Sequence, residues 1–159
     1  MIKKISLFLL AGLTLFGLTG CGSEEKNVEG TLEEILTKVY ADIPEDERPM
    51  LMNIDVLKDA SDNIEYYIGT TDIEYEEIYA SEPMMSSIAH SVVLVRVKDG
   101  ADIEETKDKI KNNVDPRKWL CVGVEEDDVI VKNKGNLIIL IMVEDENSRE
   151  KIEKGFDNL

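Results

Sequence analysis

Apolar residues recur at two spacings along the chain, and the spacing predicts where helices and strands lie. Between Thr31 and Pro44 the apolar positions follow at intervals of three and four, which places them on one helical face, and Thr31 with Glu34 has the spacing of a capping box. Asp102 precedes a second segment of this kind, and a third begins at about Asn147. We therefore expect three amphipathic helices, the first ending at Pro44.

Between the expected helices, apolar runs rich in β-branched residues predict strands. Residues 91–97 read SVVLVRV, which is the clearest strand pattern in the chain and suits the centre of a sheet. Residues 129–131 and 137–143 are two further runs, and the sequence NKGN at 133–136 suits a tight turn between them. We expect these two runs to form a hairpin.

Three other segments carry weaker patterns. Residues 73–80 are consistent with a strand that slips phase once, which indicates a bulge at residues 76–77. Residues 64–68 are consistent with a short strand or a turn. Residues 50–57 are apolar but short, so either a strand or a turn of helix fits them.

The order of these elements predicts the fold class. Helix, strand pair, helix, strand pair and helix follow one another, which argues for an α+β domain. We expect two layers, a mainly antiparallel sheet of about four strands and helices packed on one face of it. Residues 31–159 have the length of a single domain that can bury a sizeable core.

Residues 1–20 have the pattern of a secretory leader. Two lysines at positions 3–4 supply the positive start, and a largely apolar run follows over residues 5–18. That run has 14 residues, fewer than the roughly 18 to 20 that span a bilayer. The segment is therefore expected to be a leader and not a permanent membrane helix.

Residues 18–21, LTGC, match the lipobox of bacterial lipoproteins. We expect cleavage between Gly20 and Cys21, followed by acylation of the Cys21 thiol with chains such as palmitate. Two or three acyl chains hold a protein on a bilayer for long times, so we expect a lipid anchor on the extracytoplasmic face of the cell membrane, with polar residues 21–30 as a flexible tether. An ordinary leader cut elsewhere and an uncleaved anchor are the alternatives.

The chain is strongly acidic. It has 18 basic and 34 acidic residues, and removal of the leader takes away two lysines and no acid, which leaves 16 against 34 and a formal net charge of −18. Phosphate backbones repel such a chain, so we exclude nucleic acid as a partner. The acids could favour calcium, cationic wall components or basic peptides, although solubility of a tethered domain also explains them.

Residue types that catalyse reactions or bind metals are sparse. His90 is the only histidine, which excludes a site built on two histidines, and a lone histidine beside a strand is usually structural. Cys121 lies in an apolar run, which predicts a buried, inert thiol. The acidic runs at 125–128 and 144–146 lack the ligand pattern of an EF-hand, and no phosphate-binding glycine loop occurs. We therefore expect no catalytic residue, no metal and no cofactor.

Met84 and Met85 follow a proline near an expected turn. Paired methionines at such a place are either core filler or an adaptable contact surface, because the thioether side chain is flexible and polarizable. Exposed beside Trp119, Tyr79 or Met50, they would form an apolar patch that suits a hydrophobic peptide or a partner protein. Met84, Met85 and Trp119 are therefore the candidate interaction surface.

Three segments carry a resemblance to a known family: EPMMSSIAHSVVLVRVKDGA at 82–101, DPRKWLCVGV at 115–124 and VIVKNKGNLIILIM at 129–142. With the lipobox, they make the chain similar to small uncharacterised lipoproteins of low-GC Gram-positive bacteria, catalogued as a domain of unknown function. The resemblance implies an extracytoplasmic lipoprotein of the cell envelope. It implies no activity, and it carries no catalytic residue over to this chain.

These observations predict a non-enzymatic binding or protein-interaction module that contacts a protein or peptide of the cell envelope. Tethering raises the local concentration of such a module, so a weak contact suffices. One alternative is an envelope enzyme that uses carboxylates, for instance Glu82 and Asp115 as an acid and base pair. Another is a regulatory subunit of a neighbouring envelope enzyme.

Overall fold

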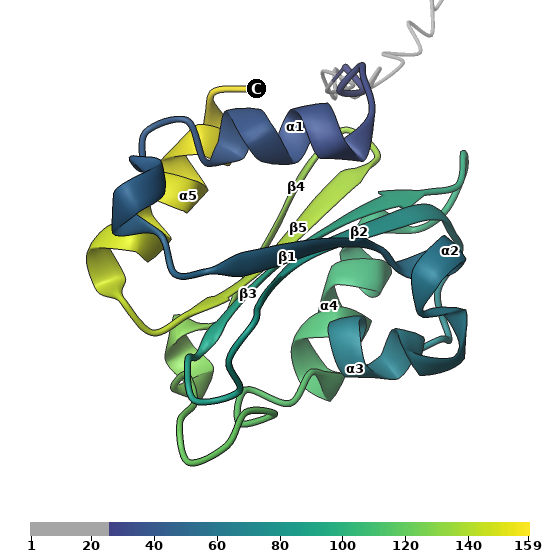
Figure 1. Cartoon of the computed structure of the whole chain (residues 1–159). Coiled ribbons are helices and arrows are strands. Elements are labelled where there is room, and N and C mark those ends of the chain that lie inside the picture. Colours follow the sequence, from purple (N-terminus) through teal and green to yellow (C-terminus); the bar gives the residue numbers. More distant parts are fainter. Residues whose placement is uncertain (1–25) are drawn as a thin grey trace, which may run out of the picture.

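The computed structural model describes residues 26–159, which form one antiparallel sheet with helices on both of its faces (Figure 1). The expected leader, its cleavage point at Gly20 and the acylation site at Cys21 lie outside the described residues. Among residues 26–159, no helix combines the length and the apolar character that crossing a bilayer requires.

The sheet has five strands in the order β1-β2-β3-β5-β4, and every neighbouring pair is antiparallel. The strands are β1 (Leu51–Asp55), β2 (Tyr75–Pro83), β3 (His90–Val97), β4 (Ile130–Lys134) and β5 (Leu137–Val143). The expected central strand is β3, and the expected hairpin is β4 with β5. The register between β2 and β3 shifts between Tyr75 and Glu77, which confirms the bulge.

Five α-helices accompany the sheet in the described chain: α1 (Leu32–Val39), α2 (Val56–Asp59), α3 (Ile64–Ile68), α4 (Ile103–Asn113) and α5 (Glu146–Asp157). Single 3₁₀ turns lie at Glu45–Glu47, Ser61–Asn63 and Glu126–Asp128. The capping box of Thr31 with Glu34 opens α1, and Asp102 opens α4 by accepting a hydrogen bond from the backbone N–H of Glu105. The three expected amphipathic helices are therefore present, although α1 ends at Val39, before Pro44.

Residues 64–68, for which a short strand or a turn was expected, form helix α3. Its buried residues are Ile64, Tyr67 and Ile68, at the spacing of one helical face. Gly69 closes the helix in the left-handed conformation, with a φ of 77°. Five residues rich in isoleucine and tyrosine fit a strand equally well by composition, and only their packing against the sheet decides between the two.

The helices lie on both faces of the sheet, which differs from the expected two layers (Figure 1). Helices α1 and α5 pack over the face that carries Val92 and Leu94 of β3, and α3 and α4 cover the face that carries Val93 and Val95. The α+β class and the antiparallel sheet are confirmed, but the domain has three layers. Every residue of β5 is buried, because its unbroken apolar run needs cover on both sides.

The segment of residues 27–30 lies against the body of the domain. Arg96 on β3 donates from Nη1 to the carbonyl oxygen of Val28 at 2.9 Å and from Nη2 to that of Gly30 at 2.8 Å. The Nε of the same Arg96 side chain donates to a carboxylate oxygen of Glu77 on β2 at 2.7 Å. These residues belong to the expected tether, so the contacts of the folded body begin earlier in the chain than expected.

Candidate functional site

Six large apolar side chains of residues 26–159 are exposed, and the segments that carry them contact one another. Three of them are exposed to more than 60 %: Met50 at 65 %, Met84 at 63 % and Leu120 at 65 %. We call the whole set the methionine-rich surface, and its members are Met50, Met52, Tyr66, Met84, Met85 and Leu120. A cluster of apolar groups in contact with water is unusual in a chain this acidic and is typical of an interaction site.

Backbone hydrogen bonds join the segments that carry this surface. The N–H of Met84 donates to the carbonyl oxygen of Met50 at 2.9 Å, and the N–H of Leu120 donates to that of Ser86 at 2.7 Å. The segment of Tyr66 is linked to the loop of Leu120 by Lys118, whose ammonium group donates to the carbonyl oxygen of Tyr66 at 3.3 Å. The segments that carry the six side chains therefore lie next to one another in the fold, although they come from distant parts of the sequence.

The structure resolves the two readings of the methionine pair. Met84 and Met85 are exposed, the latter to 49 %, so they lie on the surface and are not core filler. Trp119, which was expected beside them, is instead buried in the core at 6 % exposure, and its neighbour Leu120 is exposed. Tyr79 packs against the core on the opposite face of the sheet. The expected surface is therefore corrected by replacing Trp119 with Leu120.

A buried polar cluster lies beneath the methionine-rich surface. Glu82 on β2, Ser91 on β3 and Lys118 meet there, and the side chains of Glu82 and Lys118 are exposed to only 5 % and 4 %. Lys118 Nζ lies 2.9 Å from Glu82 Oε1 and 3.2 Å from Ser91 Oγ. The Ser91 hydroxyl donates to the same carboxylate oxygen. In the sheet, Glu82 is paired with Met52 of β1, so the cluster adjoins the surface directly.

Three aromatic rings surround the ammonium group of Lys118. It lies 4.3 Å from the ring centroid of Tyr66, 5.4 Å from that of Trp119 and 5.8 Å from that of Tyr67. Ring faces attract a cation, and the attraction grows when water is excluded. The ammonium group is therefore stabilised by an ion pair with Glu82 and by cation–π contacts with the three rings. These contacts fix the position of the loop that carries Leu120.

Burial shifts the ionisation of this pair. It raises the pKa of Glu82 and lowers the pKa of Lys118, and in each case the opposite charge of the partner offsets part of the effect. Glu82 Oε2 is buried without a hydrogen-bond partner in the described structure, so the pair is incompletely satisfied. A Ser–Lys contact is one way to activate a nucleophile, but Ser91 is fully buried, which favours a structural role for all three residues.

The carboxylate pair considered for an enzyme is not formed. Asp115 is exposed and accepts a hydrogen bond from the backbone N–H of Arg117 at 2.8 Å. Glu82 is buried with Lys118 as its partner. Two carboxylates that share a catalytic task must face a common substrate site, and these two face different environments.

His90 is buried at the start of β3, 3 % exposed, and its Nε2 lies 2.7 Å from the hydroxyl of Tyr40. The two rings stack with their centroids 6.0 Å apart. Burial lowers the pKa of His90 to about 4 and raises the pKa of Tyr40, so both side chains are uncharged at neutral pH. This environment agrees with the structural role that was expected.

Cys121 is exposed, which contradicts the expected buried thiol. It has a φ of 63° and is the one residue other than glycine with a positive φ in the described chain. The backbone turns there directly after Trp119 and Leu120, so the apolar run does not continue into the core. Apolar neighbours in sequence therefore gave a wrong prediction of burial at this position.

The acidic run at 125–128 pairs with arginines, whereas Asp145 of the run at 144–146 caps helix α5 by accepting a hydrogen bond from the backbone N–H of Ser148 at 2.8 Å. Glu125 lies 3.1 Å from Arg117, and Asp128 lies 2.9 Å from Arg149. In the part of the chain that the structure describes, no three metal-ligating side chains come close enough together to hold an ion.

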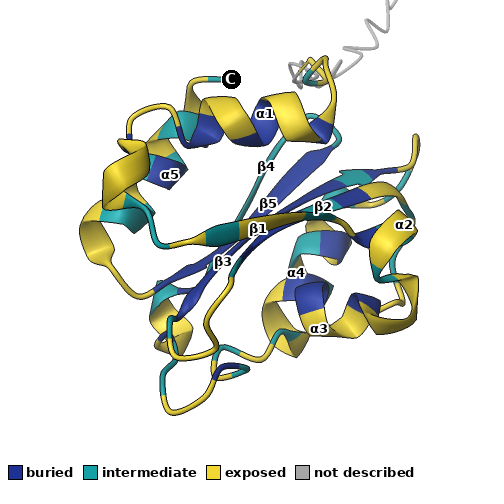
Figure 2. Cartoon of the chain, in the orientation of Figure 1, coloured by how far each residue is buried: buried dark blue, intermediate teal, exposed yellow. Residues whose placement is uncertain are grey.

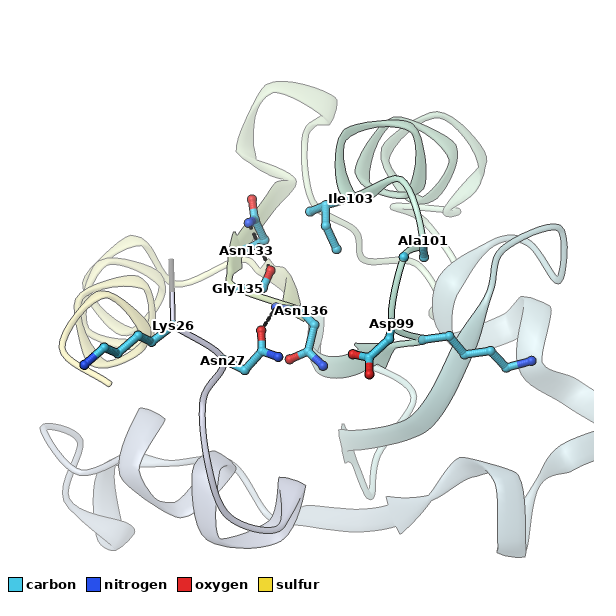
Figure 3. A pocket seen from close by; sticks show the side chains of 10 residues that line it. Lys26, Asn27, Asp99, Ala101, Ile103, Asn133, Gly135 and Asn136 are labelled. Carbon is cyan, nitrogen blue, oxygen red and sulfur yellow. Dashed lines mark hydrogen bonds between the residues drawn. The ribbon is translucent and has the colours of Figure 1, made fainter. Parts of the chain in front are cut away.

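A hollow of about 840 Å³ lies where the N-terminal segment meets the β4–β5 hairpin (Figure 3). Asn27 forms part of its wall and accepts a hydrogen bond from the backbone N–H of Asn136 at 3.1 Å. The charged residues that line it are Lys26, Lys98 and Asp99. The hollow is thus a junction between this segment and the body, and it gathers no set of groups suited to a reaction.

Comparison with known proteins finds no matching family model, no matching curated protein and no matching solved structure. The resemblance to small lipoproteins of low-GC Gram-positive bacteria therefore stays a prediction.

Proposed function

We propose that the protein is a lipid-anchored interaction module of the cell envelope, which binds an apolar segment of a partner protein or peptide through the methionine-rich surface. The acylated Cys21 holds it at the extracytoplasmic face of the membrane. In this proposal the protein binds and does not catalyse.

The clustering of exposed apolar side chains carries the proposal. Scattered single apolar residues are normal on a protein surface, but here all six of the large ones in residues 26–159 lie on segments that contact one another. Four of them are methionines, whose flexible thioether side chains adapt to partners of different shape. Burial of such a group against a partner contributes about 1.5–3 kcal/mol for each large side chain.

The polar cluster beneath the surface supports binding over catalysis. Glu82 and Lys118 bond to each other and to Ser91, and all three are buried. An enzyme would need these groups to reach a substrate. In this fold they hold strands β2 and β3 and the loop of Lys118 in a fixed arrangement, which gives the exposed side chains above them a defined shape.

Anchoring predicts a clear result for Cys21→Ala. The wild-type protein is expected in the membrane fraction and labelled by radioactive palmitate, because acyl chains on the sulfur partition into the bilayer. The variant, without that sulfur, is expected to lose the label and most of its membrane association. Ser23→Ala is the matched control and should behave as wild type. A labelled Cys21→Ala protein, or an unlabelled wild type, would contradict the anchor.

Binding through the methionine-rich surface predicts a specific crosslink. With a photoreactive amino acid at Met85 in living cells, we expect a small set of crosslinked envelope proteins. Adding Met84→Asp should reduce the yield at least tenfold, because a partner would have to desolvate the new carboxylate. Asn112→Asp on α4 introduces the same charge at an exposed site and should leave the yield unchanged. An identical crosslinking pattern with Met84→Asp would reject the surface.

A further inference from the structure

Strand β1 forms one outer edge of the sheet, and it adjoins the methionine-rich surface. It pairs with β2 on one side, and Figure 2 shows it as a largely exposed strand between the two layers of helices. Met52 lies within it, and Met50 directly precedes it. The other exposed methionines follow β2, the strand next to it.

The register shows which backbone groups of β1 face outward. The bond from Met84 N–H to the carbonyl oxygen of Met50 makes these two residues a hydrogen-bonded pair. Such pairs alternate along an antiparallel ladder, so Met52 directs its backbone groups toward β2. The N–H and C=O groups of Leu51 and Asn53 therefore point away from the sheet.

The two edge strands of the sheet differ in how far they are protected against pairing with a further strand. The other edge, β4, carries Lys132 and Lys134, and Lys132 is held by Glu153 at 3.0 Å and by Asp157 at 2.6 Å. Lysines on an edge strand prevent pairing with another strand. Strand β1 reads LMNID and has neither lysine nor proline. It is the edge that the sequence leaves open to a further strand.

The surroundings of β1 indicate the charge of what would pair with it. The acidic 3₁₀ turn Glu45–Glu47 precedes the strand, Asp55 is its last residue, and Asp59 follows it. Beside its far end lies a groove of about 480 Å³, whose charged lining residues are Glu33, Asp55, Glu76, Glu77 and a single lysine, Lys58. Of these acids, Glu77 is already paired with Arg96. A segment with basic residues at both ends would complement the negative charge at the two ends of β1. A second copy of the chain, whose net charge is −16 for the whole sequence, would be repelled.

We propose that the partner binds as an extended segment that adds a sixth strand to the sheet along β1, with apolar side chains at alternate positions and basic residues at its ends. Side chains of a strand alternate between its two faces, so every second one would lie beside Met50 and Met52. The main-chain bonds to Leu51 and Asn53 would set its register. This inference rests on the proposed function and adds the class of partner and its mode of binding.

A peptide of seven residues tests the inference. It alternates valine with threonine, carries a lysine at each end, and is labelled for fluorescence anisotropy. The protein is the chain from residue 21 with Cys21→Ser, which retains the complete sheet and both cores. We expect binding, with amide shifts in residues 51–55, and at least a tenfold loss when glutamates replace the lysines. Absence of binding would overturn the inference.

Methylated peptides separate strand pairing from general apolar contact. Methyl groups on the backbone nitrogens of alternate residues block either the edge that faces β1 or the opposite edge. One methylated set should lose binding at least tenfold and the other should bind as the parent does. Equal behaviour of the two sets would overturn pairing with β1, as would dimerisation of the chain through β1 in light scattering.

Asn53→Pro is the corresponding change in the protein. It removes an N–H that points away from β2, so the sheet itself loses no bond. We expect at least a tenfold weaker affinity, whereas Asn53→Ser should bind normally. If Asn53→Pro unfolds the domain, the methylated peptides decide alone. Failure in these assays together with a Met85 crosslink that Met84→Asp removes would reject the sixth strand and leave the proposed function intact.

Discussion

Lys118→Met will lower the free energy of unfolding by about 3–5 kcal/mol, the range for removing one partner of a buried ion pair. Methionine has a similar length, so it fills the space among the three rings, but it leaves the Glu82 carboxylate buried without its cation. One oxygen of that carboxylate already lacks a partner in the described structure. Urea denaturation followed by circular dichroism measures the loss.

Two further variants separate the buried charge from other effects of the substitution. Lys154→Met removes a lysine that is 70 % exposed and 3.4 Å from Asp42, and should cost less than about 1 kcal/mol. The double variant Glu82→Gln with Lys118→Met has no buried charge and should recover at least half of the lost stability. A single Lys118→Met variant within about 1 kcal/mol of wild type would show that the pair does not hold this end of the domain.

The stability of the domain will fall on acidification because of His90. The folded protein holds the histidine neutral, with its pKa lowered from 6.5 to about 4, so the unfolded chain binds a proton more readily. The stabilisation is complete above pH 6.5 and is lost as the pH falls toward 4. This difference in pKa between the unfolded and the folded chain corresponds to about 3 kcal/mol of unfolding free energy. Thermal unfolding between pH 7 and pH 4 measures the slope.

His90→Gln identifies the source of that slope. Glutamine cannot be protonated in this range, so the variant should be less stable than wild type at pH 7 and should lose less stability on acidification. Carboxylates elsewhere contribute equally to the pH dependence of stability in both proteins. The difference between the two stability-versus-pH curves therefore gives the contribution of the histidine. Parallel curves for wild type and His90→Gln between pH 6.5 and pH 4 would contradict the prediction.

Local signals in the sequence predicted most of the elements. Thr31 with Glu34 and Asp102 with Glu105 mark helix starts because capping needs only neighbouring residues. The number of layers was predicted wrongly, as two and not three, although the sequence carried the signal for the third. The uninterrupted apolar run of β5 indicates a strand covered on both faces, since a strand with one solvated face alternates between apolar and polar residues.

The candidate site was predicted only in part, because it depends on contacts between distant segments. The methionine pair beside Pro83 is recognisable in the sequence as a candidate. Its exposure, however, is set by the turn between β2 and β3 and by the loop of Lys118. Glu82 and Lys118 are 36 residues apart, and no spacing rule joins them. In the pair Trp119 and Leu120, both residues are apolar, and sequence alone does not say which one faces the core.

If the domain is anchored through Cys21 as proposed, the hydrogen bonds from Arg96 to Val28 and Gly30 restrict its orientation relative to the membrane. From Cys21 to Lys26 the chain spans at most about 18 Å, about half of the roughly 35 Å diameter of a globule of this size. The turn between β2 and β3, next to Met84, lies at the end of the molecule opposite to this attachment point (Figure 1). Under the proposed anchoring, this segment is too short for the domain to turn over, so the proposed ligand would approach from the wall side and not out of the lipid.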